Sequence, residues 1–169
     1  MINIKRKLKN FGPLEFLVLS SLFYVVTMLI WTATTRSDVL QKASDIKSNH
    51  KMVVELINNE VNKCSSNSDG KTSWGENCNT SWNSSKIVNY IINNFKLNNP
   101  YNTKKPLIQT SQDPRIQAEG KAGQSTDKGI IFVSSNNFEA DAGSEWIIGT
   151  CVKSPCVAAG NNELVSVYR

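Results

Sequence analysis

A long apolar run near the start of the chain is its dominant pattern. From Phe11 to Ala33, hydrophobic side chains follow one another almost without interruption. The polar exceptions after Phe16 are Ser20, Ser21, Thr27 and Thr32. The run matches the roughly 20 residues that an α-helix needs to cross a bilayer. Residues 11–33 are therefore predicted to form a transmembrane helix with one carboxylate, Glu15, near its start, where burial in lipid is costly unless the group finds a partner.

After residue 33 the pattern changes from a continuous apolar run to a helical stripe. Mostly apolar side chains recur every three or four positions, a spacing that places them on one face of an α-helix. These positions are Val39, Ala43, Ile46, His50, Val53, Ile57, Val61 and Cys64. No proline or glycine occurs between Thr34 and Cys64. The sequence predicts one helix of about 50 residues, apolar all round in its first half and amphipathic in its second.

Beyond Cys64 the pattern predicts a polar loop and one short helix. The loop runs from Ser65 to Cys78 and is rich in Ser, Asn, Asp and Gly. A helix is expected from Ser84 to Phe95, because a serine can cap its start and its apolar side chains share one face. The stretch from Asn102 to Lys128 shows no sustained period and is expected to be loop.

Three strands are predicted at the end of the chain. They are Gly129–Ser134, Glu145–Val152 and Glu163–Tyr168, separated by turn-forming residues. Consecutive strands with short connections indicate an antiparallel sheet that packs on the apolar stripe of the long helix. The expected fold class is α+β, a long N-terminal helix packed on a small C-terminal antiparallel β-sheet.

The distribution of charge predicts the orientation of the chain in a membrane. Four of the nineteen basic residues lie within the first ten positions, which leaves fifteen basic against fourteen acidic residues in the rest. By the positive-inside bias, the N-terminus is cytoplasmic and the chain after the apolar run is exported. A cleaved secretory signal is the alternative, but Ile30–Thr34 does not resemble a small-residue cleavage site. The balanced remainder carries no electrostatic footprint for nucleic acid.

Four cysteines, Cys64, Cys78, Cys151 and Cys156, lie on the predicted exported side, where disulfides persist. Three pairings are open from the sequence. Cys64 with Cys78 and Cys151 with Cys156 are favoured, because each pair closes one polar, turn-rich segment. The alternative, a zinc site, would need close-paired ligands, and His50 is the only histidine. No metal or other cofactor is predicted.

Two further positions have residue types that could carry chemistry. His50 lies on the apolar stripe and is interpreted as a packed histidine at the helix–sheet interface. Glu139, Asp141 and Glu145 are acidic neighbours, but their spacing fits no EF-hand loop and indicates a solvated turn. No phosphate-binding loop or catalytic triad is visible, so an enzyme is not expected and no catalytic residue is predicted.

The order of these parts resembles the type IV pilin family. The residues that carry the resemblance are Lys9-Asn10-Phe11-Gly12-Pro13-Leu14-Glu15-Phe16. In that family a prepilin peptidase removes a basic leader, the new first residue is N-methylated, and a glutamate stands at the fifth mature position. The spacing of Phe11 and Glu15 is the same. His50–Cys64 and Phe95–Asn102 resemble the helix end and the following segment of some disulfide-bearing pilins.

The sequence also departs from the family pattern. Asn10 stands where the family nearly always has glycine before the cleavage site, and Gly12 and Pro13 replace the usual residues after it. Proline in a first helical turn costs little, since its missing N–H has no helical partner there. Thr32 lies about where many pilins have a helix-kinking proline. These departures put cleavage between Asn10 and Phe11 in question and are compatible with a divergent or minor subunit.

The resemblance implies a division of the chain and a function. Residues 1–10 would be the leader, 11–33 the membrane and filament-core segment, and 34–169 the exported domain. After processing in a bacterial inner membrane, copies would polymerise through this helix into an extracellular filament, with the Glu15 carboxylate paired to the Phe11 amine of a neighbour. The implied partners are other copies, other pilins, the prepilin peptidase, the inner-membrane assembly machinery and, before assembly, lipid.

Two other functions stay open. The chain could be a minor pilin or pseudopilin that initiates or caps a short fibre of a secretion or DNA-uptake machine. Alternatively, it could be a monomeric binding domain that keeps its leader as a fixed anchor. In that case Glu15 would lie at the cytoplasmic edge of the membrane and reach water.

Overall fold

The computed structural model describes residues 12–119, 128–134 and 145–168. The chain divides into two compact units, Met1–Leu40 and Gln41–Arg169, which are described separately. In the first unit, the described residues form the start of one continuous α-helix, α1 (Pro13–Ser66). The predicted single long helix is confirmed, and α1 has 54 residues without a break.

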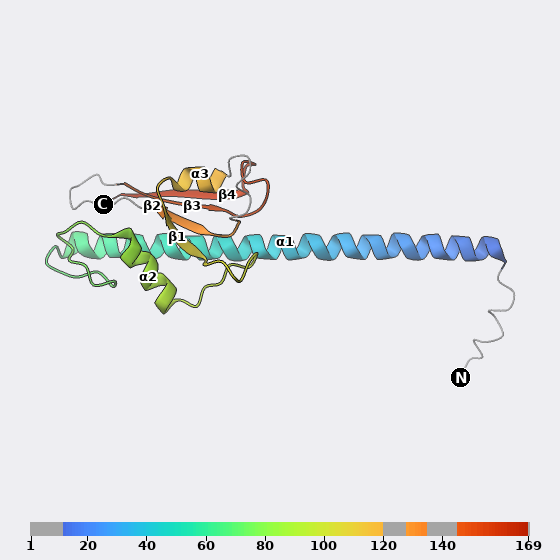
Figure 1. The fold of residues 1–169 in the computed structure, drawn as a ribbon, viewed down its shortest axis with the longest axis horizontal. Helices are drawn as coiled ribbons and strands as arrows, with labels where there is room; N and C mark the ends of the chain where they lie inside the picture. The colour runs from blue at the N-terminus through green and yellow to red at the C-terminus, as the bar shows by residue number, and fades with distance from the viewer. Residues whose placement is uncertain (1–11, 120–127, 135–144, 169) are drawn as a thin grey trace, which may run out of the picture. The chain divides into compact units, whose positions relative to one another are not determined.

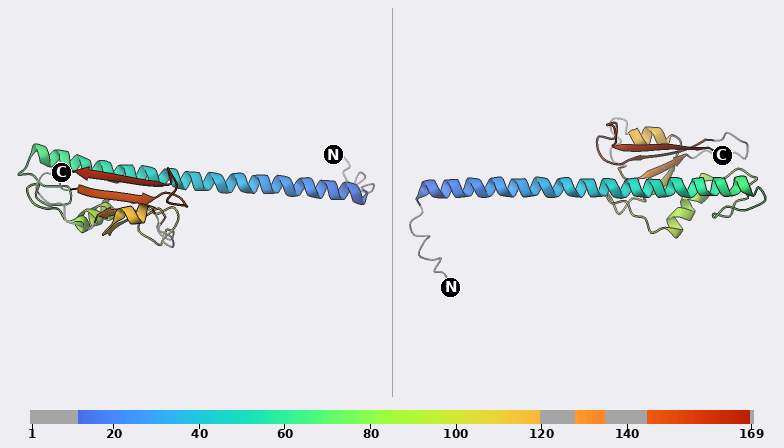
Figure 2. Two further views of the ribbon diagram at one scale, coloured as in Figure 1. Left: turned by 90° about the horizontal axis from the view of Figure 1, so that it is seen from above. Right: turned by 180° about the vertical axis from the view of Figure 1, so that it is seen from behind.

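The second unit is an α+β domain built on the second part of α1. Its further elements are α2 (Ser84–Asn94), β1 (Ile108–Ser111), α3 (Pro114–Glu119), β2 (Ile131–Ser134), β3 (Glu145–Cys151) and β4 (Asn162–Tyr168). The four strands form one sheet in the order β1-β2-β3-β4. Figure 1 shows α3 on one face of this sheet and the second half of α1 along the other. Figure 2 shows β3 and β4 running along the same part of α1. The predicted fold class is confirmed.

The stretch from Asn102 to Lys128 was expected to be loop, and this expectation is wrong. It contains strand β1 and helix α3. The sheet is consequently mixed, because β1 pairs in parallel with β2, while β3 is antiparallel to both of its neighbours, β2 and β4, as predicted. A four-residue strand and a six-residue helix are too short to show a period in a stretch rich in Lys, Pro and Gln.

The core lies between the apolar stripe of α1 and the sheet. The stripe residues Ile46, Val53 and Ile57 are fully buried, and they share one hydrophobic cluster with Trp146 and Ile148 of β3. The β3 residues that alternate with Trp146 and Ile148 point to the other face of the sheet, toward α3. A Cβ added at Gly149 would lie 2.6 Å from the carbonyl oxygen of Pro114 and 3.0 Å from the Cβ of Ala118. Glycine at this position therefore lets α3 approach the sheet closely.

Candidate membrane and assembly surface

The first part of α1 presents apolar side chains around its whole circumference. Leu14, Phe16 and Trp31 are each at least 70% exposed, and no residue of the most apolar window of the helix is buried. The helix is long and apolar enough to span a membrane. Contiguous apolar surface of this extent is rare on soluble monomers and marks a membrane or protein contact. We call residues 14–35 of α1 the apolar segment.

The serine and threonine hydroxyl groups of the apolar segment form hydrogen bonds within the helix. Each donates to a backbone carbonyl three or four residues earlier, as Thr27 does to Phe23 at 3.0 Å and to Tyr24 at 2.8 Å. The other donors are Ser20, Ser21, Thr32, Thr34 and Thr35. Since hydrocarbon offers no hydrogen-bond partners, this arrangement removes the cost that these hydroxyls would otherwise have in lipid.

The length of the uncharged part suits a bilayer. No acidic or basic residue occurs from Phe16 to Thr35, and Arg36 and Asp38 follow directly. A helix of about 20 residues is about 30 Å long, which equals the usual thickness of the hydrocarbon core. The first charges after Glu15 are thus placed where a spanning helix would reach the opposite interface.

Glu15 lies in the first turn of α1 and folds back over the helix start. Its Oε2 accepts a hydrogen bond from the backbone N–H of Gly12 at 3.0 Å. The N-terminus of a helix carries partial positive charge and unpaired N–H groups, and both stabilise a carboxylate. Asn10 and Phe11 lie outside the described residues, so the predicted cleavage site and the Phe11 amine stay predictions.

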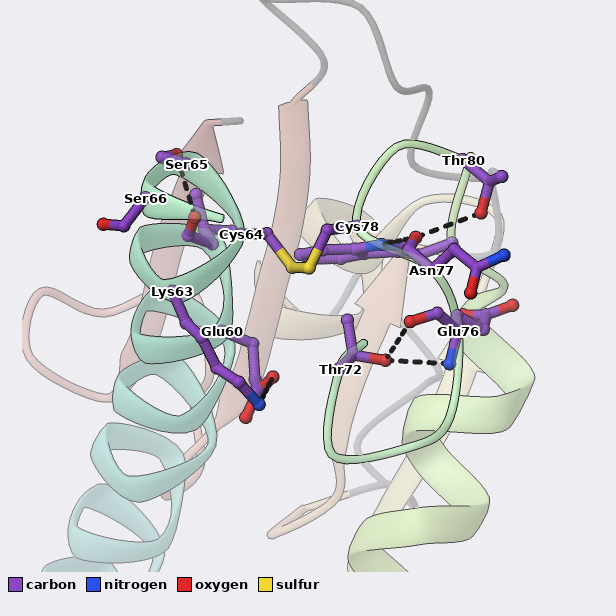
Figure 3. Close-up of a disulfide and its surroundings, with 12 residues drawn as sticks. Glu60, Lys63, Cys64, Ser65, Ser66, Thr72, Glu76, Asn77, Cys78 and Thr80 are labelled. Carbon is purple, nitrogen blue, oxygen red and sulfur yellow. Dashed lines mark hydrogen bonds and ion pairs between the residues drawn. A yellow bond between two sulfur atoms is a disulfide. The ribbon is translucent and has the colours of Figure 1, made fainter. Parts of the chain in front are cut away.

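The far end of α1 is tied to the following loop by a disulfide. Cys64 in the last turns of the helix is bonded to Cys78, as the sequence predicted, and both are buried (Figure 3). Cys151 and Cys156 form the second bond, which also matches the prediction. No cysteine in the described part of the chain is free.

Two buried carboxylates hold the loop between Cys64 and Cys78. Glu60 accepts hydrogen bonds from the backbone N–H and the hydroxyl of Ser73. Glu76 accepts from the backbone N–H of Asn83 at 3.0 Å and is 3.3 Å from the ammonium of Lys86. This role could not be predicted from the sequence, because acidic residues in a polar stretch resemble solvent-exposed surface.

His50 is buried where α1 crosses the sheet, as predicted. It is 3% exposed, and its Nε2 lies 3.3 Å from the carbonyl oxygen of Ile148, so Nε2 carries the proton and donates. Burial lowers the pKa of His50 below its usual value, against the opposing effects of the Ile148 carbonyl and of Glu163. A neutral histidine is the form that this site stabilises.

The acidic neighbours near β3 are only partly described. Glu139 and Asp141 lie outside the described residues. Glu145 accepts hydrogen bonds from Ser166 at 2.6 Å and Tyr168 at 3.2 Å, and it is 3.4 Å from Arg115. The Ser166 hydroxyl is the main cause that lowers the pKa of Glu145. In this part of the structure, Glu145 joins β3, β4 and α3 at the surface.

Comparison of the chain with protein-family models, with curated proteins and with solved structures found no significant match. The apolar segment, the Glu15 carboxylate at its start and the disulfide-tied domain are thus the features from which a function is inferred.

Proposed function

We propose that this protein is a pilin-like structural subunit that is anchored in a membrane by the apolar segment and polymerises through it into an extracellular filament. The observation that carries the proposal is the exposed helix surface of residues 14–35 combined with a single carboxylate, Glu15, in the first turn of the helix. Lipid and a bundle of identical helices are both apolar environments that would cover this surface. One helix can therefore serve first as an anchor and later as a filament core.

In the proposed assembly, Glu15 sets the position of one helix against the next. Cleavage between Asn10 and Phe11 would create a positively charged amine close to Glu15. In the monomer, Glu15 is satisfied by the Gly12 N–H of its own helix. In a filament, the carboxylate would instead pair with the Phe11 amine of a neighbouring copy, and only one axial offset between the helices would satisfy both charges.

The domain beyond Leu40 would form the outer surface of this filament. Its own core is complete, because the stripe of α1 is covered by the sheet and α2 is packed into the same cluster. The two disulfides suit an exported location, where oxidising conditions maintain them.

A fixed membrane anchor is the second candidate, and two observations favour it. Asn10 stands at the position where a prepilin peptidase prefers glycine. In addition, Glu15 already has a partner in its own helix, so it does not need a neighbour. In this alternative the same helix spans the membrane and the domain works as a monomer.

The test compares filaments from cells that produce the wild-type chain, Glu15→Gln or the control variant Thr27→Val. Glutamine keeps the shape of the side chain but removes the charge, whereas Thr27 forms bonds only within its own helix. We expect sheared filaments, visible by electron microscopy, from the wild type and from Thr27→Val. Filament yield should fall at least about tenfold in Glu15→Gln, with equal amounts of each chain in the membrane. Wild-type cells without filaments, or undiminished filaments from Glu15→Gln, would contradict the proposal.

A further inference from the structure

Strand β1 is one edge of the sheet, and part of its backbone points away from the sheet. The backbone N–H of Ile131 in β2 donates to the carbonyl of Leu107 at 2.6 Å, and Ile108 is the register partner of Ile131. Along a parallel ladder, alternate residues direct their backbone groups toward the same neighbour. The N–H and C=O groups of Ile108 and Thr110 therefore point to the outer edge, where the described part of the chain places no strand.

Helix α2 packs beside β1 (Figure 1). Its side chains form the second wall of a groove along the strand. The groove has a volume of about 340 Å³ and is lined by Val88, Asn89 and Ile92 from α2 and by Ile108 and Thr110 from β1. Ile92 is 48% exposed although its neighbour Ile91 is buried. An open strand edge beside an apolar wall is the geometry that binds extended peptides as an added strand.

The groove continues toward the start of β1 into a smaller hollow of about 70 Å³. Phe95 and Leu97 line this extension, together with Ile92, Pro106 and Ile108, which also line the main groove. The combined lining is mostly apolar. It would accept a hydrophobic side chain at every second position of an extended peptide, because alternate side chains of a strand point to the same face.

The chain segment that contains the groove residues carries more basic than acidic side chains. Between Asn79 and Gln112 it contains four lysines and no aspartate or glutamate. They are Lys86, Lys96, Lys104 and Lys105, of which Lys86 is paired with the Glu76 carboxylate at 3.3 Å. Lys96 lies between two residues that line the smaller hollow, and Lys104 and Lys105 immediately precede its lining residue Pro106. A peptide at this end of the groove would therefore be in a positive field, which favours carboxylates on the ligand.

We propose that the groove between α2 and β1 is a docking site for an extended, acidic peptide segment of a partner protein, which adds to the sheet as a strand beside β1. Backbone hydrogen bonds to Ile108 and Thr110 supply the pairing. The wall at Ile92 receives an apolar side chain, and Lys96 and Lys104 select carboxylates. This interaction belongs to the second unit and does not depend on filament assembly.

The test measures peptide binding to the full chain in uncharged detergent micelles. The probe is a fluorescein-labelled octapeptide of alternating aspartate and valine, and binding is followed by fluorescence anisotropy. We expect saturable binding of the aspartate–valine probe. A lysine–valine peptide of the same pattern should bind at least about tenfold more weakly. Methylation of alternate backbone nitrogens of the probe should abolish binding. Hydrogen exchange should slow in the segment that contains Ile108 and Thr110.

Two variants of the groove and one control complete the experiment. Thr110→Pro removes an N–H that faces the outer edge without removing a bond to β2, and Ile92→Ser removes the apolar wall. Val157→Ser is the control, because Val157 is also exposed, at 68%, and does not line the groove. Both groove variants should weaken binding at least about tenfold and the control should not. Equal affinity for acidic and basic peptides, no binding, or wild-type affinity in Ile92→Ser would overturn the proposal.

Discussion

Removal of the Cys64–Cys78 disulfide should destabilise the domain by an amount that its loop length determines. The bond joins residues 14 positions apart. For a loop of this length, the chain-entropy relation predicts that the disulfide adds about 3 kcal/mol to the free energy of unfolding at 25 °C. The native loop is also held by hydrogen bonds from Ser73 to Glu60 and from Asn83 to Glu76. The double variant Cys64→Ala, Cys78→Ala should therefore keep the native loop, and most of the loss should come from the greater freedom of the unfolded chain.

The assay is urea denaturation of the full chain in micelles, followed by tryptophan fluorescence. Trp74 and Trp82 lie in or beside the loop with ring centroids 5.3 Å apart, so their emission reports its unfolding. The matched control is Cys151→Ala, Cys156→Ala, which removes a bond across only five positions. The same relation gives about 2 kcal/mol for that shorter loop.

The decisive result is which of the two double variants loses more unfolding free energy. We expect the Cys64, Cys78 variant to lose about 3 kcal/mol of unfolding free energy and to retain native fluorescence. A loss below about 1 kcal/mol would mean that the unfolded chain remains restricted without the bond. A larger loss from the shorter loop would show that loop closure is not the main source of stabilisation.

Three further predictions concern the domain beyond Leu40. Burial lowers the pKa of His50 in the folded state, so its contribution to stability should be fully present above about pH 6.5 and should be lost as the pH falls through the lower folded pKa. Denaturation midpoints should show this decrease in the wild type and much less of it in His50→Leu. Glu60→Ala removes the buried carboxylate that accepts hydrogen bonds from the Ser73 N–H and hydroxyl, and it should cost about 1–3 kcal/mol in urea denaturation. An undiminished midpoint would refute the anchoring role. Gly149→Ala forces a methyl group against Pro114 and Ala118 and should also cost about 1–3 kcal/mol, whereas Gly12→Ala, with open space around it, should leave the domain unchanged.

Elements with a sustained hydrophobic period could be predicted from the sequence. The stripe that includes Ile46, His50 and Val53 predicted the second half of α1, and the strand runs predicted β2, β3 and β4 to within two residues at each end. Such patterns are reliable because burial against one partner surface imposes them along the whole element.

The elements that the sequence did not predict depend on contacts far away in the chain. Strand β1 has only four residues, and its pairing with β2 joins Ile108 to Ile131. Helix α3 had one local signal, Asp113 followed by Pro114, since proline is favoured at the first helical position and the Asp113 side chain accepts the N–H of Arg115. Six residues are too few to show a helical period, so this signal alone does not predict a helix.

The candidate surface was predictable in location but not in detail. The apolar run and the position of Glu15 are visible in the sequence, and both disulfide pairs followed from the segments that they close. The hydrogen bond from Gly12 to Glu15 and the burial of Glu60 and Glu76 depend on local geometry that charge patterns do not indicate. The edge of β1 could not be predicted because β1 itself was not.

The most direct test of the proposed function is the mass of the N-terminal peptide of the protein taken from its native cell. Processing before assembly predicts a chain that begins at Phe11 and carries one methyl group on its amine, despite Asn10 at the cleavage position. A chain that still carries residues 1–10 would contradict filament assembly, since the Phe11 amine would not exist to pair with Glu15. The protein would then be a fixed membrane anchor for its exported domain.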